Sequence, residues 1–513
     1  HLVLARVAPC AATAVAFVAT SLGAARLALA EEPRKVTEPS VLQESAEVTS
    51  VADAFDDEDK FDLHLTLGFQ QTWKSGSVNR ETNSDLAEFS SGGYIAGNQS
   101  VAKYTESTSR LNTRADIGLY KDIALVLRMP VILSNDRKLE GKSGSDANQS
   151  VILQGAPGEQ LFNLPFVSPT RSGIEYLAVG LDVAPMNQQR DRTKPTWVIA
   201  LEGRFSVGEA MHACSKNGPI NQPGPQQSCA YPSDINRNGE GSEFKDGNRF
   251  LDGSNYRGGA HRAPGVSRGT TGLQAHTYIS KRTKYIEPYS GFEALFEFQN
   301  ASSDYGGADL QGSLVNHPPF QGTLIGGLAV IPWEIRDQFQ RIELDFRAKG
   351  TYRSEGRDYS PIFDALGSSD APSLRRPNFA SFQALGNNPN ASVVNPSSEK
   401  VYTTGITDVQ QYGIYSLSAQ FTFQAGEYVK FNVGAQFTAE QGHLITLDQP
   451  CNPDFKKNDG TFGPCRSTGQ GGVPAATGIP NPNYRPVIDA PGRRFRFDDG
   501  TLVDAWVNAI VMF

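Results

Sequence analysis

The sequence predicts an all-β protein, a transmembrane antiparallel up-and-down β-barrel of about twelve strands with long extracellular loops. Three observations predict it. Apolar and polar residues alternate in many separate stretches. The connections between these stretches alternate between short and long, and no long apolar run follows residue 30. Because a chain in lipid must pair every backbone N–H and C=O, only a helix or a closed barrel can cross a membrane.

Residues 341–352 show the alternation most clearly, reading RIELDFRAKGTY. Side chains of a strand point to opposite faces in turn, so Ile342, Leu344 and Phe346 share an apolar face. The other face carries Arg341, Glu343, Asp345, Arg347 and Lys349. A helical period would scatter both classes around the axis. The stretch is also about as long as a membrane-spanning strand, roughly 9–11 residues.

Comparable stretches recur along the chain to its last residue. We expect strands at 61–69, 111–119, 123–131, 173–184, 197–207, 270–280, 286–298, 323–333, 339–353, 415–423, 429–439 and 502–513. The polar segments 75–108, 134–171, 209–268, 299–322, 354–409 and 441–494 are expected to be loops. Alternating short turns and long loops are typical of a transmembrane β-barrel, with the short turns on the periplasmic side.

The N-terminal residues predict export. An apolar run at 11–22 is followed by Ala28-Leu29-Ala30, a small-residue cleavage signal, so residues 1–30 are interpreted as a signal peptide. Residues 31–60 are acidic and aperiodic, which indicates a flexible periplasmic segment. The barrel is expected to span 61–513. The net charge of −8 argues against a nucleic-acid partner, because such partners require a basic surface.

Four cysteines follow the signal peptide, which in an exported protein indicates disulfides. We expect the local pairs Cys214–Cys229 and Cys451–Cys465, each within one long loop. Four cysteines allow three pairings, so a cross-loop pairing such as Cys214–Cys465 remains the alternative.

The last predicted strand has a regular alternation that reaches the final residue of the sequence. Val503, Ala505, Val507, Ala509 and Val511 alternate up to the terminal Phe513. This stretch resembles the C-terminal strand of Gram-negative outer-membrane β-barrel proteins. The resemblance implies a bacterial outer-membrane location in contact with lipid, and recognition of Phe513 by the barrel assembly machinery. Pro130 departs from the pattern, since proline removes a ladder hydrogen bond, and predicts a bulge in the third strand or an error in its position.

The faces opposite the apolar ones are expected to form the lumen. They carry Arg114, Asp116, Arg128, Glu202, Arg204, Glu293, Glu297, Arg341, Glu343, Asp345, Arg347, Lys349 and Lys430. A barrel of about twelve strands lies between the filled eight-stranded type and the open sixteen-stranded porin. The sequence therefore predicts a porin-like channel for passive diffusion of small polar or charged solutes. Alternatively, the charges pair across the lumen and plug it, leaving a barrel that presents its loops as an adhesin or receptor.

An outer-membrane hydrolase is a further alternative, because some barrels of similar size are lipases or proteases. Such an enzyme needs a nucleophile or carboxylate next to a histidine that a third group orients. Six histidines follow the signal peptide, and none lies in an H-x-S arrangement. We therefore expect no catalytic site.

One loop contains a partial calcium-loop pattern. Asp234, Asn236 and Asn238 alternate before Gly239, as the oxygen ligands of a calcium loop do. The twelfth position is Lys245 where the pattern requires a carboxylate. We expect an ordinary turn, with a loop Ca²⁺ as the alternative, and no other cofactor.

Overall fold

The structure is a computed structural model of the 513-residue chain. It describes residues 47–55, 61–83, 96–142, 161–216, 229, 263–300, 303–306, 308–310, 313, 315–335, 338–369, 371–377, 400–401, 403–448, 466–467, 474–475 and 484–513. No helix in these ranges is long and apolar enough to cross a membrane.

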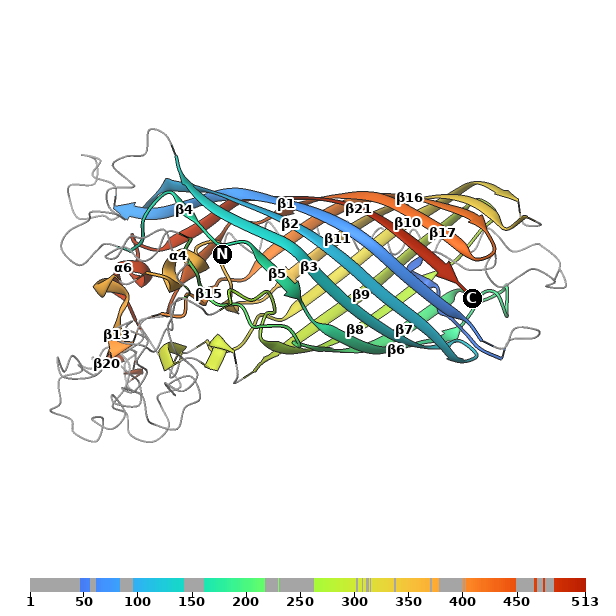
Figure 1. The fold of residues 1–513 in the computed structure, drawn as a ribbon, viewed down its shortest axis with the longest axis horizontal. Helices are drawn as coiled ribbons and strands as arrows, with labels where there is room; N and C mark the ends of the chain where they lie inside the picture. Colours follow the sequence, from blue (N-terminus) through green and yellow to red (C-terminus); the bar gives the residue numbers. More distant parts are fainter. Residues whose placement is uncertain are drawn as a thin grey trace.

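Twelve long strands in the described part of the chain form one closed antiparallel barrel (Figure 1). They are β1 (Leu63–Asn83), β2 (Ala96–Tyr120), β3 (Ile123–Gly141), β6 (Leu177–Met186), β7 (Thr196–Phe205), β8 (Thr270–Ser280), β9 (Ile286–Gln299), β10 (Gln321–Ile335), β11 (Gln340–Arg353), β16 (Tyr412–Gly426), β17 (Val429–Glu440) and β21 (Phe495–Met512). Each pairs with the next, and β21 pairs with β1. The predicted fold class and strand number are confirmed.

The barrel closes between the first and the last strand. The Leu63 N–H donates to the Phe513 carbonyl at 2.9 Å, and the Phe513 N–H donates to the Leu63 carbonyl at 3.0 Å. From there β1 and β21 stay in register to Arg80 and Phe495, with one shift between Ser75 and Ser77. No edge is therefore left open between the two ends of the chain.

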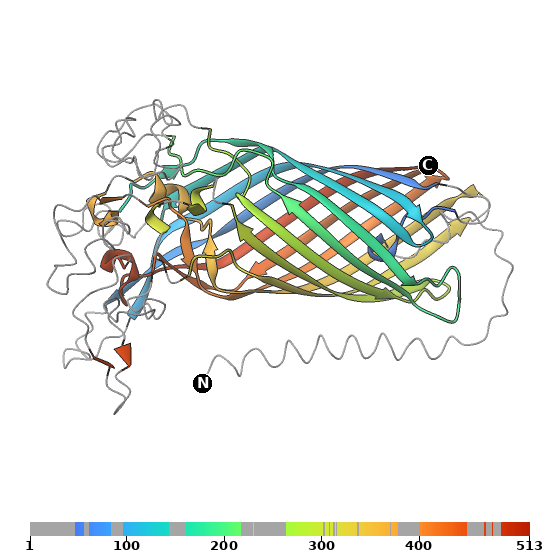
Figure 2. The ribbon, with the colours of Figure 1, turned by 90° about the horizontal axis from the view of Figure 1, so that it is seen from below.

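The two ends of the barrel differ (Figure 2). At the turn end, where β1 begins and β21 finishes, short connections join β2 to β3, β6 to β7, β8 to β9, β10 to β11 and β16 to β17. The strands that flank the longer connections, among them 206–269, 354–411 and 441–494, meet those connections at the opposite end, the loop end. This alternation agrees with the one predicted from the sequence.

Several strands extend beyond their predicted limits. β1 runs to Asn83 and β2 starts at Ala96, although 75–108 was expected to be loop; β3 runs to Gly141, and β21 starts at Phe495. In these extensions polar residues pair through the backbone, as at Ser77 opposite Lys103. The extensions lie beyond the apolar band, so their outer face need not be apolar, while Val78, Tyr104 and Leu139 are buried in an apolar core at the loop end.

Pro130 lies within β3, where the ladder to the next strand is interrupted. β3 pairs with β6 up to Arg128 and with the short β5 (Arg171–Ile174) from Val131 onward. Between the two, the Pro130 carbonyl accepts the Glu175 N–H at 3.0 Å. The strand is therefore correctly placed, and its ladder to β5 shifts register just beyond the proline, between Ile132 and Asn135.

Apolar side chains cover the outside of the barrel. Leu417 is 66% exposed and Phe346 is 51% exposed, as expected for side chains that face lipid. Acidic side chains point inward, and Glu202 is only 3% exposed. The two faces of the alternating strands therefore lie as the sequence predicts.

The loop end carries a folded cap. Its small elements are β4 (Phe166–Val167), β5, η6 (Asp304–Gly306), η7 (Ala308–Leu310), β12 (Gly356–Asp358), α4 (Phe363–Gly367), η9 (Pro372–Leu374), β13 (Arg376–Pro377), β14 (Lys400–Val401), β15 (Thr407–Val409), β18 (His443–Thr446), β19 (Arg466–Ser467), β20 (Pro474–Ala475) and α6 (Pro486–Asp489). An apolar core joins Leu366 of α4 and Ile488 of α6 to Phe497 of β21. Three of the long connections therefore supply apolar residues to this core, through Phe162, Leu366 and Ile488 among others.

A buried ion pair joins three of these connections. The Arg171 guanidinium bonds the Asp364 carboxylate and the backbone carbonyls of His212, Pro264 and Gly265. Asp364 also accepts the Ser168 hydroxyl at 2.8 Å and the Cys214 N–H at 3.0 Å. Both charged groups are buried and form several hydrogen bonds, so removing either one would leave an uncompensated charge in the cap.

Substituting the outer face tests the orientation of the barrel. Phe346→Arg places a charge among lipid tails at the middle of β11, which we expect to cost roughly 2–4 kcal/mol and to impair assembly. The matched control is Tyr352→Arg on the same face near the strand end, where the cost should fall to about 0–1 kcal/mol. Heat-modifiable electrophoretic mobility reports folding. Normal assembly of the Phe346→Arg variant would contradict this orientation.

The cap should be less stable at neutral than at acidic pH. Asp408 of β15 is buried opposite Arg357 in the ladder, and burial raises the pKa of its carboxyl to about 7 although the Arg357 charge opposes this. An unfolded cap releases this proton near pH 4. Between about pH 4 and pH 7 the folded cap thus binds more protons, so its stability falls as the pH rises.

Limited proteolysis of the cap at pH 5 and pH 8 measures this effect. We expect faster cleavage at pH 8, and a smaller difference between the two pH values in the Asp408→Asn variant, which cannot ionise. Asp191→Asn, in the exposed turn between β6 and β7, serves as the control. Equal pH dependence in all three proteins would show that Asp408 does not control the cap.

Candidate functional site

A cavity of about 490 Å³ lies inside the barrel. Its wall is formed by residues of most of the long strands together with Val48 and Ser50 of the N-terminal segment. Of the predicted lumen residues, those that line it are Arg114, Arg128, Glu293, Asp345, Arg347 and Lys349. The strand alternation turns these side chains inward, opposite the apolar ones that face outward.

The remaining predicted lumen residues lie around this cavity or nearer the barrel ends. Asp116, Glu202 and Arg204 pair with residues of its wall or with one another. Glu297 lies toward the loop end, where it pairs with Arg268 at 3.1 Å. Arg341, Glu343 and Lys430 lie toward the turn end, and Arg341 contacts Glu334 at 2.9 Å.

One side of the cavity holds a cluster of arginines and carboxylates on β2, β3, β6 and β7. Arg114 contacts Asp116 at 2.7 Å and Asp182 at 3.8 Å. Arg128 donates to Glu202 at 2.6 Å, and Arg204 donates to the same carboxylate at 3.0 Å. Because these charges compensate one another, this side of the wall is fixed and close to neutral.

A second cluster lies on β8, β9 and β11. The Tyr289 hydroxyl donates to Asp345 at 2.6 Å, and Arg347 donates to the Tyr289 oxygen and to Asp345, both at 2.9 Å. The Tyr278 hydroxyl donates to Glu293. Arg347 is thus held by one carboxylate and one phenol.

Two further features of the wall escaped the sequence analysis. Asp504 accepts hydrogen bonds from Gln70 at 3.1 Å, Thr72 at 2.5 Å and Gln436 at 3.3 Å. Trp506 donates its indole N–H to Gln420 at 3.0 Å. The alternation of β21 places both residues on its inner face, but Leu502, Ile510 and Met512 make that face unusually apolar, and neither residue was among the predicted lumen residues.

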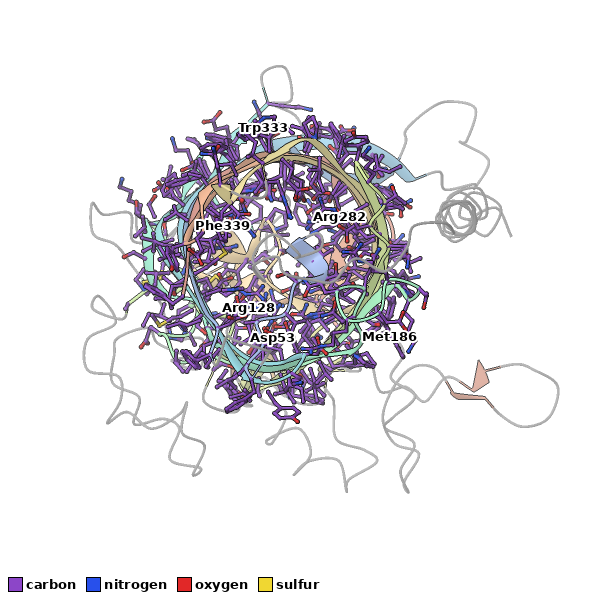
Figure 3. The ribbon with its side chains drawn as sticks, turned by 90° about the vertical axis from the view of Figure 1, so that its right-hand side faces the viewer. Asp53, Arg128, Met186, Arg282, Trp333 and Phe339 are labelled. Atoms are coloured by element: carbon purple, nitrogen blue, oxygen red, sulfur yellow. A yellow bond between two sulfur atoms is a disulfide. The ribbon has the colours of Figure 1, made fainter. Side chains whose placement is uncertain are left out.

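The N-terminal segment occupies the turn end of the barrel. Figure 3 looks into the barrel from this end and shows Asp53 and Arg128 within the ring of strands. Val48 of η2 (Glu47–Thr49) packs against a small apolar cluster that includes Tyr278 and Tyr289. The Thr49 hydroxyl lies 2.9 Å from the Ser280 hydroxyl.

Two contacts hold the end of this segment against the wall. The Asp53 carboxylate pairs with Arg190 at 2.9 Å. The Asp53 carbonyl lies against Gly118, where a Cβ would come within 1.9 Å of the oxygen, so this close approach requires glycine. Residues 47–55 thus differ from the flexible segment expected at 31–60, because Val48 and Asp53 find partners on the inner wall.

The remaining predicted site residues are the four cysteines, the candidate calcium ligands and Phe513. The structure contains the Cys214–Cys229 disulfide. Cys451 and Cys465 lie outside the described residues, as do Asp234, Asn236 and Asn238. Within the described ranges no group of three His, Cys, Asp or Glu side chains is placed to hold a metal ion. Phe513 ends the chain with its side chain exposed on the barrel surface.

The histidines lie in separate places. His276 lines the cavity with its ring 5.0 Å from that of Tyr278. His212 is buried in the cap, where its Nδ1 lies 2.9 Å from Asp304. His443 stacks on Tyr412 at 4.0 Å near the loop end.

Comparisons with known proteins show resemblance at the level of the barrel. No family model and no curated protein matches the chain. Among solved structures, an outer membrane channel from Pseudomonas putida F1 matches with 7% identity, covering 94% of this chain and 100% of that one, at a TM-score of 0.34. A FadL homologue from Pseudomonas aeruginosa matches with 9% identity over 88% and 90% of the two chains, at a TM-score of 0.27.

The outer membrane protease OmpT from Escherichia coli matches with 6% identity, over 88% of this chain and 96% of that one, at a TM-score of 0.22. At such identities and TM-scores the likeness carries no argument about function. The closed sheet and its apolar exterior are the deciding features. The described part of the chain is a closed antiparallel β-barrel with an apolar exterior.

Loosening the N-terminal segment should widen the bore. We expect Val48→Asp to raise the single-channel conductance, because a carboxylate cannot remain packed against Tyr278 and Tyr289 without a partner. Val48→Ala removes contacts without adding a charge and should have a smaller effect. Planar-bilayer recordings measure the conductance. Unchanged conductance in the Val48→Asp variant would mean that this segment does not limit the bore.

Proposed function

We propose that the protein is an outer-membrane channel through which small polar or charged solutes diffuse passively. The observation that carries the proposal is the cavity of about 490 Å³, lined by charged and amide side chains, inside a barrel with an apolar exterior. Charged groups that line a narrow passage discriminate among solutes by charge and dipole. The outer-membrane location, export through a cleaved signal peptide and recognition of Phe513 by the assembly machinery belong to the same proposal.

The second candidate is a plugged barrel that presents its loops as an adhesin or receptor. The packing of residues 47–55 inside the turn end and the folded cap at the loop end favour it. Single-channel conductance of the purified protein in planar bilayers separates the two. Discrete conducting levels support the channel. A correctly folded protein that does not conduct supports the plugged barrel.

The enzyme alternative has no comparable support. His276 is the histidine that lines the cavity, and Tyr278 beside it donates its hydroxyl to Glu293. We therefore place solute passage, not hydrolysis, at this site. An assay of phospholipid and peptide hydrolysis by the folded protein tests this choice.

Neutralising two lumenal cations should shift the ion preference toward cations. Arg347→Gln with Lys349→Gln removes two positive charges from the wall, while Asp345 keeps its hydrogen bond from Tyr289. Field lines concentrate in a narrow low-dielectric passage, so charges there dominate selectivity. Lumenal substitutions also leave membrane insertion intact.

Reversal potentials across a salt gradient measure this shift. The control is Lys121→Gln with Lys284→Gln, which neutralises two exposed lysines at the turn end. We expect the control to match the wild type. A lumenal variant that fails to fold, or that keeps the wild-type reversal potential, would contradict the assignment of these residues to the conducting path.

A further inference from the structure

Lys349 differs from the other cations of the cavity wall. Arg114, Arg128 and Arg347 each pair with a carboxylate. Among the described residues, Lys349 has neither a hydrogen bond nor an ion pair, although it lines the same cavity. Lys349 is half-buried in the wall, and an ammonium group that lacks a partner there is available for an anionic group of a ligand.

Two carboxylates of the wall, Glu293 and Asp504, are hydrogen-bonded to neutral groups. Glu293 accepts the Tyr278 hydroxyl, and Asp504 accepts two amide groups and one hydroxyl. In the part of the chain that the structure describes, neither forms an ion pair. Both nevertheless lie near enough for their charges to act on Lys349. They are available for a cationic group of a ligand.

The charges of the wall are balanced, with four cationic and four acidic side chains around the cavity. A simple anion bound at Lys349 would be opposed by Glu293 and Asp504. A simple cation bound at the carboxylates would be opposed by Lys349. A solute that carries both charges gains both attractions, and its net charge of zero leaves the balance unchanged.

We propose that the cavity selects small zwitterions, with Lys349 binding the anionic group and Glu293 and Asp504 binding the cationic group. The inference rests on the proposed function, because it names the class of solute that the channel admits. A volume of about 490 Å³ falls within the range of small-molecule sites, roughly 300–1,000 Å³. The Gln436 amide and Trp506 supply neutral polar and aromatic surface beside the charges.

Three probes with the same two-carbon linker isolate the requirement for both charges. Taurine has an ammonium and a sulfonate, isethionate replaces the ammonium by a hydroxyl, and ethanolamine replaces the sulfonate by a hydroxyl. Equilibrium dialysis against the folded full-length protein in detergent gives their affinities. We expect taurine to bind roughly tenfold more tightly than either analogue, as the loss of one charge-assisted contact implies.

Variants at Lys349 identify the site. Lys349→Met should lower taurine affinity roughly tenfold and leave ethanolamine affinity unchanged or raised, because only the anionic group loses its partner. Lys349→Arg should retain most of the binding. Lys121→Met, at an exposed turn, is the matched control. Equal affinity for the three probes, or unchanged taurine binding by Lys349→Met, would overturn the proposal.

Measurement of taurine flux into proteoliposomes tests the proposed channel separately from the proposed zwitterion site. Selective binding without flux would support the zwitterion site and refute the channel. Flux of ions and of all three probes without preference would support the channel and refute the zwitterion site. Heat-modifiable mobility confirms that each variant is folded before it is measured.

Discussion

The structure depends on one constraint, the pairing of each of the twelve long strands with two neighbours in a closed ring. The ring closes where Leu63 and Phe513 exchange backbone hydrogen bonds, so the first and last strands shield each other's edges. Once the strands are closed and their outer face is apolar, every alternate side chain points into the lumen. The ion pairs of the interior follow from this, because charges withdrawn from water need partners.

Parts of the chain that do not span the barrel pack at both of its ends. At the loop end, the Arg171–Asp364 pair joins three long connections through hydrogen bonds. At the turn end, Val48 and Asp53 attach the N-terminal segment to the inner wall. Both features narrow the ends of the lumen, so a wide aqueous pore does not fit this barrel.

Within that cavity, arginine and lysine have different roles. The planar guanidinium groups of Arg128 and Arg347 make several directed hydrogen bonds and hold the wall in place. Lys349 carries a compact charge on a flexible stem and has no such bonds among the described residues. The fixed clusters thus shape the wall, while Lys349 is the cation that the proposed zwitterion site assigns to the anionic group of the solute.

The sequence by itself determined the closed antiparallel sheet, its strand number and which faces carry the lumenal charges, because lipid imposes a two-residue period wherever it touches a strand. It also indicated the local pairing of Cys214 with Cys229. The tertiary structure alone decided the extensions of β1 to β3, the cap, the position of residues 47–55 and the hydrogen-bond partners of Asp504. Outside the bilayer no period is imposed, and inside the lumen neighbours are set by strand tilt and register, which bring together residues hundreds of positions apart.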